Sequence, residues 1–182
     1  MLKRDWMQPL RWLMLASLVA LIAGCASPAA REAMVVKTVG DGSRSSGTVS
    51  VTTQGGQDTG AMDSSNISDE DFAKAIEESI VGSGLFADVV HGKAANYRLT
   101  VSIIELTKPM FGASFTVTME AAWVLIKADS GEALLKKSVR SSYTATMGAA
   151  FAGVTRLRLA VEGAAKENIR LGLQEIASLK LP

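Results

Sequence analysis

The stretch that decides the fold is "SFTVTMEAAWVLIKA" (Ser114–Ala128), which is followed after "DSG" by "EALLKKSVRSSYTAT" (Glu132–Thr146). Apolar and polar side chains alternate in the first segment, which is the period of a strand with one face on a core. The side chains expected on that core are Phe115, Val117, Met119, Ala121, Trp123 and Leu125. Because "DSG" is a turn sequence, the two segments predict a pair of long antiparallel strands.

Further strands are expected on either side of this pair. The runs that predict them are rich in β-branched residues or alternate in polarity. They are Ala33–Val39 and Gly47–Thr53, expected to form a hairpin, then Leu85–Gly92 and Asn96–Thr107. In the last run Ile104 and Leu106 break the alternation, which is typical of a β-bulge.

Two segments carry helix signals. In "ISDEDFAKAIEESIVGSG" (Ile67–Gly84), Ser68 is expected to cap the helix together with Asp71, and Gly82 or Gly84 to end it. The second helix is expected over Val154–Leu179, where an apolar stripe recurs at helical spacing. Its members are Leu157, Val161, Ala165, Ile169, Leu173 and Ile176. The sequence therefore predicts an α+β fold, a mostly antiparallel sheet of about six strands with two amphipathic helices packed on one face.

The N-terminus reads as an export signal. Basic residues precede "WLMLASLVALIAG" (residues 12–24), an apolar run that is shorter than the ~20 residues of a membrane span. We therefore expect a signal peptide at residues 1–24, a short tether at 25–32 and a single domain at 33–182. Translation could begin at Met1 or at Met7, because the segment that starts at Met7 is a complete signal peptide by itself.

Ile22, Ala23 and Gly24 directly precede Cys25, the only cysteine of the chain. This arrangement resembles the lipobox of bacterial lipoproteins, and a chance cysteine in an N-terminal anchor is the alternative. The resemblance implies that a signal peptidase recognises Ile22, Ala23 and Gly24 and cuts before Cys25, which then carries acyl chains such as palmitate. In Gram-negative lipoproteins the next residue directs sorting, and Ala26 implies the outer membrane, on its periplasmic face.

The domain itself resembles small Gram-negative outer-membrane lipoproteins that assist lipopolysaccharide assembly or serve as auxiliary parts of ABC-type transporters. The resemblance lies in "FAKAIEESIVGSGLF" (residues 72–86) before "YRLTVSI" (residues 97–103). It implies a lipid-anchored accessory protein that contacts an envelope protein complex or a lipid. A purely structural envelope lipoprotein is the alternative, followed by a periplasmic hydrolase or acyl transferase.

Composition excludes several other functions. The chain has 19 Lys and Arg against 18 Asp and Glu, so no nucleic-acid partner is expected. His91 is the only histidine, which excludes a multi-histidine metal site, and no G-x-S-x-G or S-x-x-K motif supplies a nucleophile. Glu105 and Glu120 are interpreted as solvated strand residues. We expect no catalytic residues, metal or cofactor, and the oligomeric state stays open.

Two loops carry unusual apolar side chains. "KPMFGASF" (Lys108–Phe115) contains Met110 and Phe111, and "TMGAAFAGVTR" (Thr146–Arg156) contains Met147 and Phe151. These four side chains are candidate contacts to a partner or to lipid. The alternatives are a plug at the end of the core for the first loop and a flexible stretch of small residues for the second.

Overall fold

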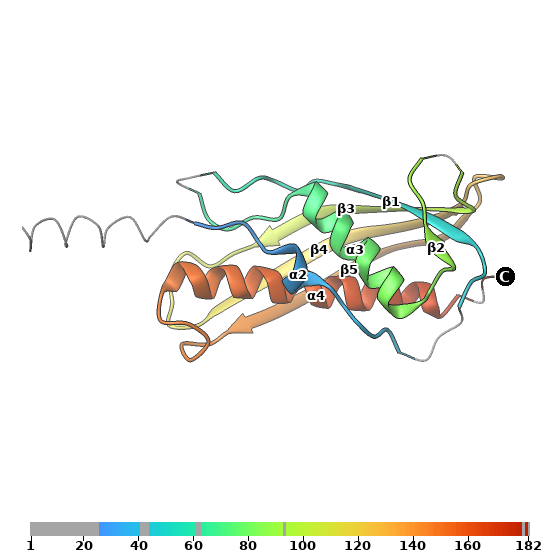
Figure 1. The fold of residues 1–182 in the computed structure, drawn as a ribbon. Coiled ribbons are helices and arrows are strands. Elements are labelled where there is room, and N and C mark those ends of the chain that lie inside the picture. The colour runs from blue at the N-terminus through green and yellow to red at the C-terminus, as the bar shows by residue number, and fades with distance from the viewer. Residues whose placement is uncertain (1–25, 41–43, 61–62, 93, 180, 182) are drawn as a thin grey trace, which may run out of the picture.

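A computed structural model describes residues 26–40, 44–60, 63–92, 94–179 and 181. Within them, a mixed five-stranded sheet in the order β2-β1-β3-β4-β5 is covered by helices (Figure 1). The strands are β1 (Thr48–Gln54), β2 (Asp88–Val89), β3 (Tyr97–Thr107), β4 (Phe115–Lys127) and β5 (Ala133–Ala145). The helices are α2 (Arg31–Met34), α3 (Asp69–Ser83) and α4 (Gly153–Ala177). The predicted signal peptide and Cys25 lie outside the described residues.

The predicted hairpin of β4 and β5 is confirmed, with Phe115 opposite Ala145 at one end and Ile126 opposite Ala133 at the other. All six side chains expected on the core face of β4 are buried. Strand β3 pairs with β4 in antiparallel register, and that register shifts between Ile103 and Glu105. The predicted bulge in this run is therefore confirmed, and it lies at Ile104.

Helix α4 packs along the core face of β4 and β5 (Figure 1). The approach is close because glycines face the sheet: a Cβ added at Gly172 would lie 2.3 Å from the Trp123 ring. Buried Asn168 accepts a hydrogen bond from the Trp123 indole at 3.0 Å and donates to the Val139 carbonyl at 2.8 Å. The predicted apolar stripe is buried except for half-buried Leu157. This interface is thus both tightly packed and hydrogen-bonded.

Helix α3 begins and ends where the sequence predicts. The Ser68 hydroxyl accepts a hydrogen bond from the Asp71 amide at 3.1 Å, which satisfies one free amide of the first turn. Gly84 closes the helix in the left-handed conformation, with φ of 63°. Local signals alone were sufficient for this element.

The predicted α+β class is confirmed, and the expected sheet of about six mostly antiparallel strands is close but not exact, because the sheet has five strands and is mixed. Strand β1 runs parallel to both β2 and β3, because α3 carries the chain back between β1 and β3 as a crossover connection. The run Leu85–Gly92 contributes only the two-residue strand β2. The sheet is therefore parallel on the β2 side and antiparallel on the β5 side.

The expected hairpin of Ala33–Val39 with Gly47–Thr53 is also wrong. Residues Arg31–Met34 form the short helix α2, and the chain after it runs extended against α3. There the Val36 amide donates a hydrogen bond to the Ser79 hydroxyl at 2.9 Å. Met34 and Val36 are both buried, so this apolar run adds to the core without joining the sheet.

No helix among the described residues is long and apolar enough to span a bilayer.

Candidate functional site

The two apolar loops lie side by side at one end of the sheet. Residues 108–114 precede β4 and residues 146–152 follow β5, and the pairing of Phe115 with Ala145 brings them together. Their large apolar side chains are exposed: Met110 84%, Phe111 84%, Met147 62% and Phe151 102%. We call these four side chains the apolar loop end. The alternative that Met110 and Phe111 plug the core is excluded by their exposure.

Arg156 holds the second loop in place. Its Nη1 donates hydrogen bonds to the carbonyl oxygens of Ala150 and Phe151 at 2.8 and 2.7 Å. Arg156 is only 9% exposed, and its guanidinium lies 5.6 Å from the centre of the Phe115 ring. Phe151 therefore projects into solvent from a backbone that is tied to α4 and β4.

The N-terminal segment is attached at the same end of the molecule. The Ala29 amide donates to the Asn66 carbonyl at 3.1 Å, and the Ala30 amide donates to Oε1 of buried Glu162 at 2.9 Å. Arg158 on α4 pairs with that carboxylate at 3.5 Å. The chain is thus fixed to the domain from Ala29 onward.

Lys108, at the root of the first loop, connects that loop to the N-terminal segment. Its ammonium donates to the Asn66 side-chain oxygen and, at 3.2 Å, to the Ser65 carbonyl. Burial lowers the pKa of the Lys108 ammonium, and the charge of Asp63 opposes that shift. Asn66 therefore contacts Ala29 with its backbone and Lys108 with its side chain.

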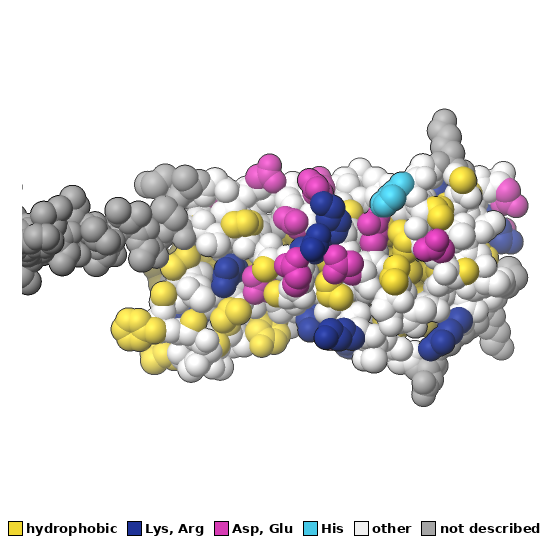
Figure 2. Space-filling view, viewed as in Figure 1, with side chains coloured by type: hydrophobic (Ala, Val, Ile, Leu, Met, Phe, Trp, Pro, Cys, Tyr) yellow, Lys and Arg dark blue, Asp and Glu magenta, His cyan; other side chains and the backbone are white. Residues whose placement is uncertain are grey.

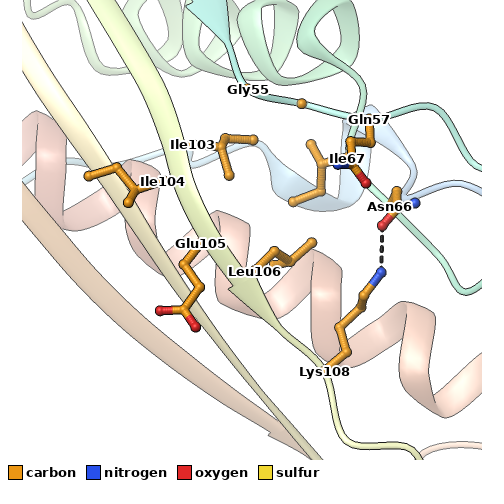
Figure 3. A pocket seen from close by; sticks show the side chains of 10 residues that line it. Gly55, Gln57, Asn66, Ile67, Ile103, Ile104, Glu105, Leu106 and Lys108 are labelled. Atoms are coloured by element: carbon orange, nitrogen blue, oxygen red, sulfur yellow. Dashed lines mark hydrogen bonds between the residues drawn. The ribbon is translucent and has the colours of Figure 1, made fainter.

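A pocket of about 210 Å³ lies beside this contact, between the turn after β1 and the bulged part of β3 (Figure 3). This volume is below the ~300–1,000 Å³ of typical small-molecule sites. Its lining residues are Gly55, Gly56, Gln57, Asn66, Ile67, Ile103, Ile104, Glu105, Leu106 and Lys108. Glu105 points away from Lys108 in Figure 3 and accepts a hydrogen bond from Thr107 at 2.8 Å. The lining residues accordingly form no acid–base pair.

The other candidate polar groups are spread over the surface. His91 is 84% exposed in its side chain, and its Nδ1 lies 3.7 Å from a Glu77 carboxylate oxygen. Glu105 and Glu120 are opposite each other in the β3–β4 register, where Glu120 accepts from Ser138 at 2.6 Å. The described part of the chain contains no cluster of three or more His, Cys, Asp or Glu that could hold a metal ion.

Sequence reasoning missed the residues that organise this end: Asn66, Arg156 and Glu162. Nothing near Arg156 or Glu162 in the sequence distinguishes them from the exposed charges of an amphipathic helix. Their partners are the Phe151 carbonyl and the Ala30 amide, both outside the helix that carries them. An isolated buried charge has no periodic signature, so only the folded arrangement reveals it.

The chain is similar to several solved structures of bacterial proteins. A DUF330 protein from Xanthomonas campestris matches with a TM-score of 0.56 and 12% identity, over 81% of this chain and 91% of that one. PelC from Paraburkholderia phytofirmans, a dodecamer, matches with a TM-score of 0.50 and 13% identity, over 78% and 93%. Uncharacterized lipoprotein B from Nitrosomonas europaea gives a TM-score of 0.44 and 14% identity, over 79% and 86%.

No protein-family model matches the sequence, and no curated protein matches it. At 12 and 13% identity, the similarity to the DUF330 protein and to PelC is one of fold. The fold alone does not define an activity. Function must therefore be argued from the residues of this chain.

Proposed function

We propose that this chain is a non-enzymatic accessory lipoprotein of the bacterial envelope, anchored through acylated Cys25 to the periplasmic face of the outer membrane. Its partner is an envelope protein complex or a lipid. The lipobox-like segment Ile22–Cys25 supports the anchor, and Ala26 supports the outer membrane as its location. A purely structural lipoprotein is the second candidate, and it differs in having no partner to bind.

The observation that carries this proposal is the attachment of Ala29 and Ala30 to the domain. Ala29 follows Cys25 by four positions along the chain. At no more than ~3.6 Å per residue, the acylated cysteine would lie within about 14 Å of Ala29. Acyl chains on Cys25 would thus hold the domain directly on the membrane surface, and two or more chains bind durably where one is marginal.

The side chains at the apolar loop end and around the pocket also favour an accessory role over an enzymatic one. The described residues around the apolar loop end and the pocket offer hydrogen-bonded Lys108 and Glu105 and no nucleophile held by a base. The exposed apolar side chains at the loops are instead typical of an interaction surface.

Acylation is tested by intact-mass analysis and by metabolic labelling with an alkyne fatty acid in wild type and in Cys25→Ala. The wild-type protein is expected to carry acyl chains and to sediment with outer membranes, whereas Cys25→Ala is expected to lose label and membrane attachment. Ala26→Asp is the matched sorting variant, expected to move the protein to the inner membrane with acylation intact. An unmodified thiol on exported wild-type protein would overturn the proposal.

A partner is tested by cross-linking in the envelope, followed by solubilisation in detergent and identification of bound proteins and lipids. An accessory protein is expected to enrich a defined protein complex or lipid, and Cys25→Ala is expected to lose it. A wild-type protein that enriches neither would favour the structural lipoprotein.

A further inference from the structure

We propose that the apolar loop end, which consists of Met110, Phe111, Met147 and Phe151, inserts into the interface of the bilayer that holds the anchor. The inference rests on the proposed function, because the acylated Cys25 is what brings the domain to the membrane. It adds a second membrane contact made by the folded domain itself. That contact would fix the orientation of the domain, with the loop end of the sheet toward lipid and the β4–β5 turn toward water.

The first argument is position. The N-terminal segment meets the domain at Asn66, and the same Asn66 binds Lys108 at the root of the first loop. Cys25 lies within about 14 Å of Ala29, so the acyl chains would enter the bilayer near the loops. Figure 2 shows hydrophobic side chains gathered at the end of the molecule where the loops before β4 and after β5 lie in Figure 1.

The second argument is the chemistry of the two loops. Residues 108–114 and 146–152 contain no Asp or Glu, and their only charged residue is Lys108. Methionine and phenylalanine at loop tips, with one cation and no carboxylate, suit the boundary between headgroups and acyl chains. The opposite end of the same hairpin is different, because Asp129, Ser130 and Glu132 make it polar and acidic.

The third argument is the bracing of the exposed ring. Phe151 is fully exposed, yet its carbonyl accepts a hydrogen bond from buried Arg156. The backbone is therefore held with the ring outward before any contact is made, which avoids the entropy cost of ordering a loop on binding. A bilayer is the occupant favoured here, because the short tether places lipid at this end whether or not a protein partner is present.

A fluorescent probe at single positions tests the proposal in the full-length lipoprotein. Acylation consumes the only native thiol, so Phe151→Cys supplies the one free thiol for an environment-sensitive dye. Ser130→Cys is the matched control, since Ser130 is exposed in the turn at the opposite end of the hairpin. Each labelled protein is reconstituted into phosphatidylethanolamine–phosphatidylglycerol vesicles, with and without lipids that carry a spin label near the headgroup.

The dye at position 151 is expected to be blue-shifted and quenched several-fold more by the spin-labelled lipids than the dye at position 130. Equal quenching at both positions in vesicle-bound protein would overturn the inference. Shielding at position 151 that appears only in native envelope membranes, and not in lipid vesicles, would also overturn it and would identify a protein as the occupant.

The proposed function is tested separately, on unlabelled wild-type protein, so its failure is distinguishable from these outcomes. If the proposed function is wrong, the wild-type protein will have a free thiol on Cys25 and will not bind to vesicles. The unfolding midpoint of Phe151→Cys is expected to equal that of wild type, since the ring makes no packing contact to lose. Phe111→Cys is the second position, in the other loop, and is expected to behave like Phe151→Cys.

Discussion

The interface between strand β4 and helix α4 and the loops next to these two elements both carry large apolar side chains, with opposite exposure. In the interface between them, Trp123 is fully buried and its indole is hydrogen-bonded to Asn168. At the loops beside their ends, Phe111 is 84% exposed and Phe151 is 102% exposed. Burial of Trp123 stabilises the fold, whereas Phe111 and Phe151 leave most of their surface in water. The exposed side chains of the loop end are the ones for which we propose contact with the bilayer.

The largest test of this contrast removes one ring from each region. Trp123→Ala is expected to lower the free energy of unfolding by about 3–5 kcal/mol, because it leaves a cavity and removes the donor that pairs with the buried Oδ1 of Asn168. Phe111→Ala is the matched control, and it is expected to leave that free energy within about 0.5 kcal/mol of wild type. Chemical denaturation followed by circular dichroism measures both. Similar losses in the two variants would show that the loop end is part of the core after all.

A smaller test concerns the glycines of α4 that face the sheet. Gly172→Ala is expected to cost about 1–3 kcal/mol, because its Cβ would lie 2.3 Å from the buried Trp123 ring. A Cβ at Gly163 would lie equally close to the Tyr143 ring, but Tyr143 is 48% exposed and can swing outward. Gly163→Ala is therefore expected to cost clearly less. Equal shifts in the unfolding midpoints would mean that the interface relaxes as easily around Trp123 as around Tyr143.

The buried region is the one that the sequence predicts well. Alternation in β4, the apolar stripe of α4 and the Ser68 cap are local or periodic signals, and each one agrees with the structure. What the sequence could not supply is the partner of a short apolar run. Ala33–Val39 has the composition of a strand, but its Val36 amide bonds to Ser79, 43 residues away.

The direction of β1 was mispredicted for a different reason. Treating Ala33–Val39 as its hairpin partner made an antiparallel sheet the natural arrangement. In the structure Ala33–Val39 is not a strand, and α3 lies between β1 and β3 along the chain. The two strands and the helix form a strand–helix–strand unit, in which β1 and β3 pair in parallel. One wrong strand therefore changed the predicted topology of half the sheet.

The loop end shows where prediction from sequence stops. Met110, Phe111, Met147 and Phe151 stand out in the sequence as apolar residues among small ones. Loops have no periodicity, however, so the sequence does not say whether such residues turn inward or outward. The pairing of Phe115 with Ala145, which brings the loops together, follows from the register of the β4–β5 hairpin.

The smallest expected effect lies on the solvent side of α4, away from both regions. Hydrogen bonds from Arg170 hold the pKa of the Glu167 carboxyl below its usual value. A lowered pKa means that this pair stabilises the fold above the unfolded-state pKa of about 4.3, and that the contribution is lost as pH falls through the folded pKa. Because both side chains are more than a third exposed, at 37 and 36%, water screens the pair and its contribution should stay below about 1 kcal/mol. Thermal unfolding at pH 7 and pH 3 measures it: Glu167→Gln is expected to melt slightly below wild type at pH 7, and the difference is expected to narrow at pH 3. A difference that is undiminished at pH 3 would show that Glu167 acts through packing and not through its charge.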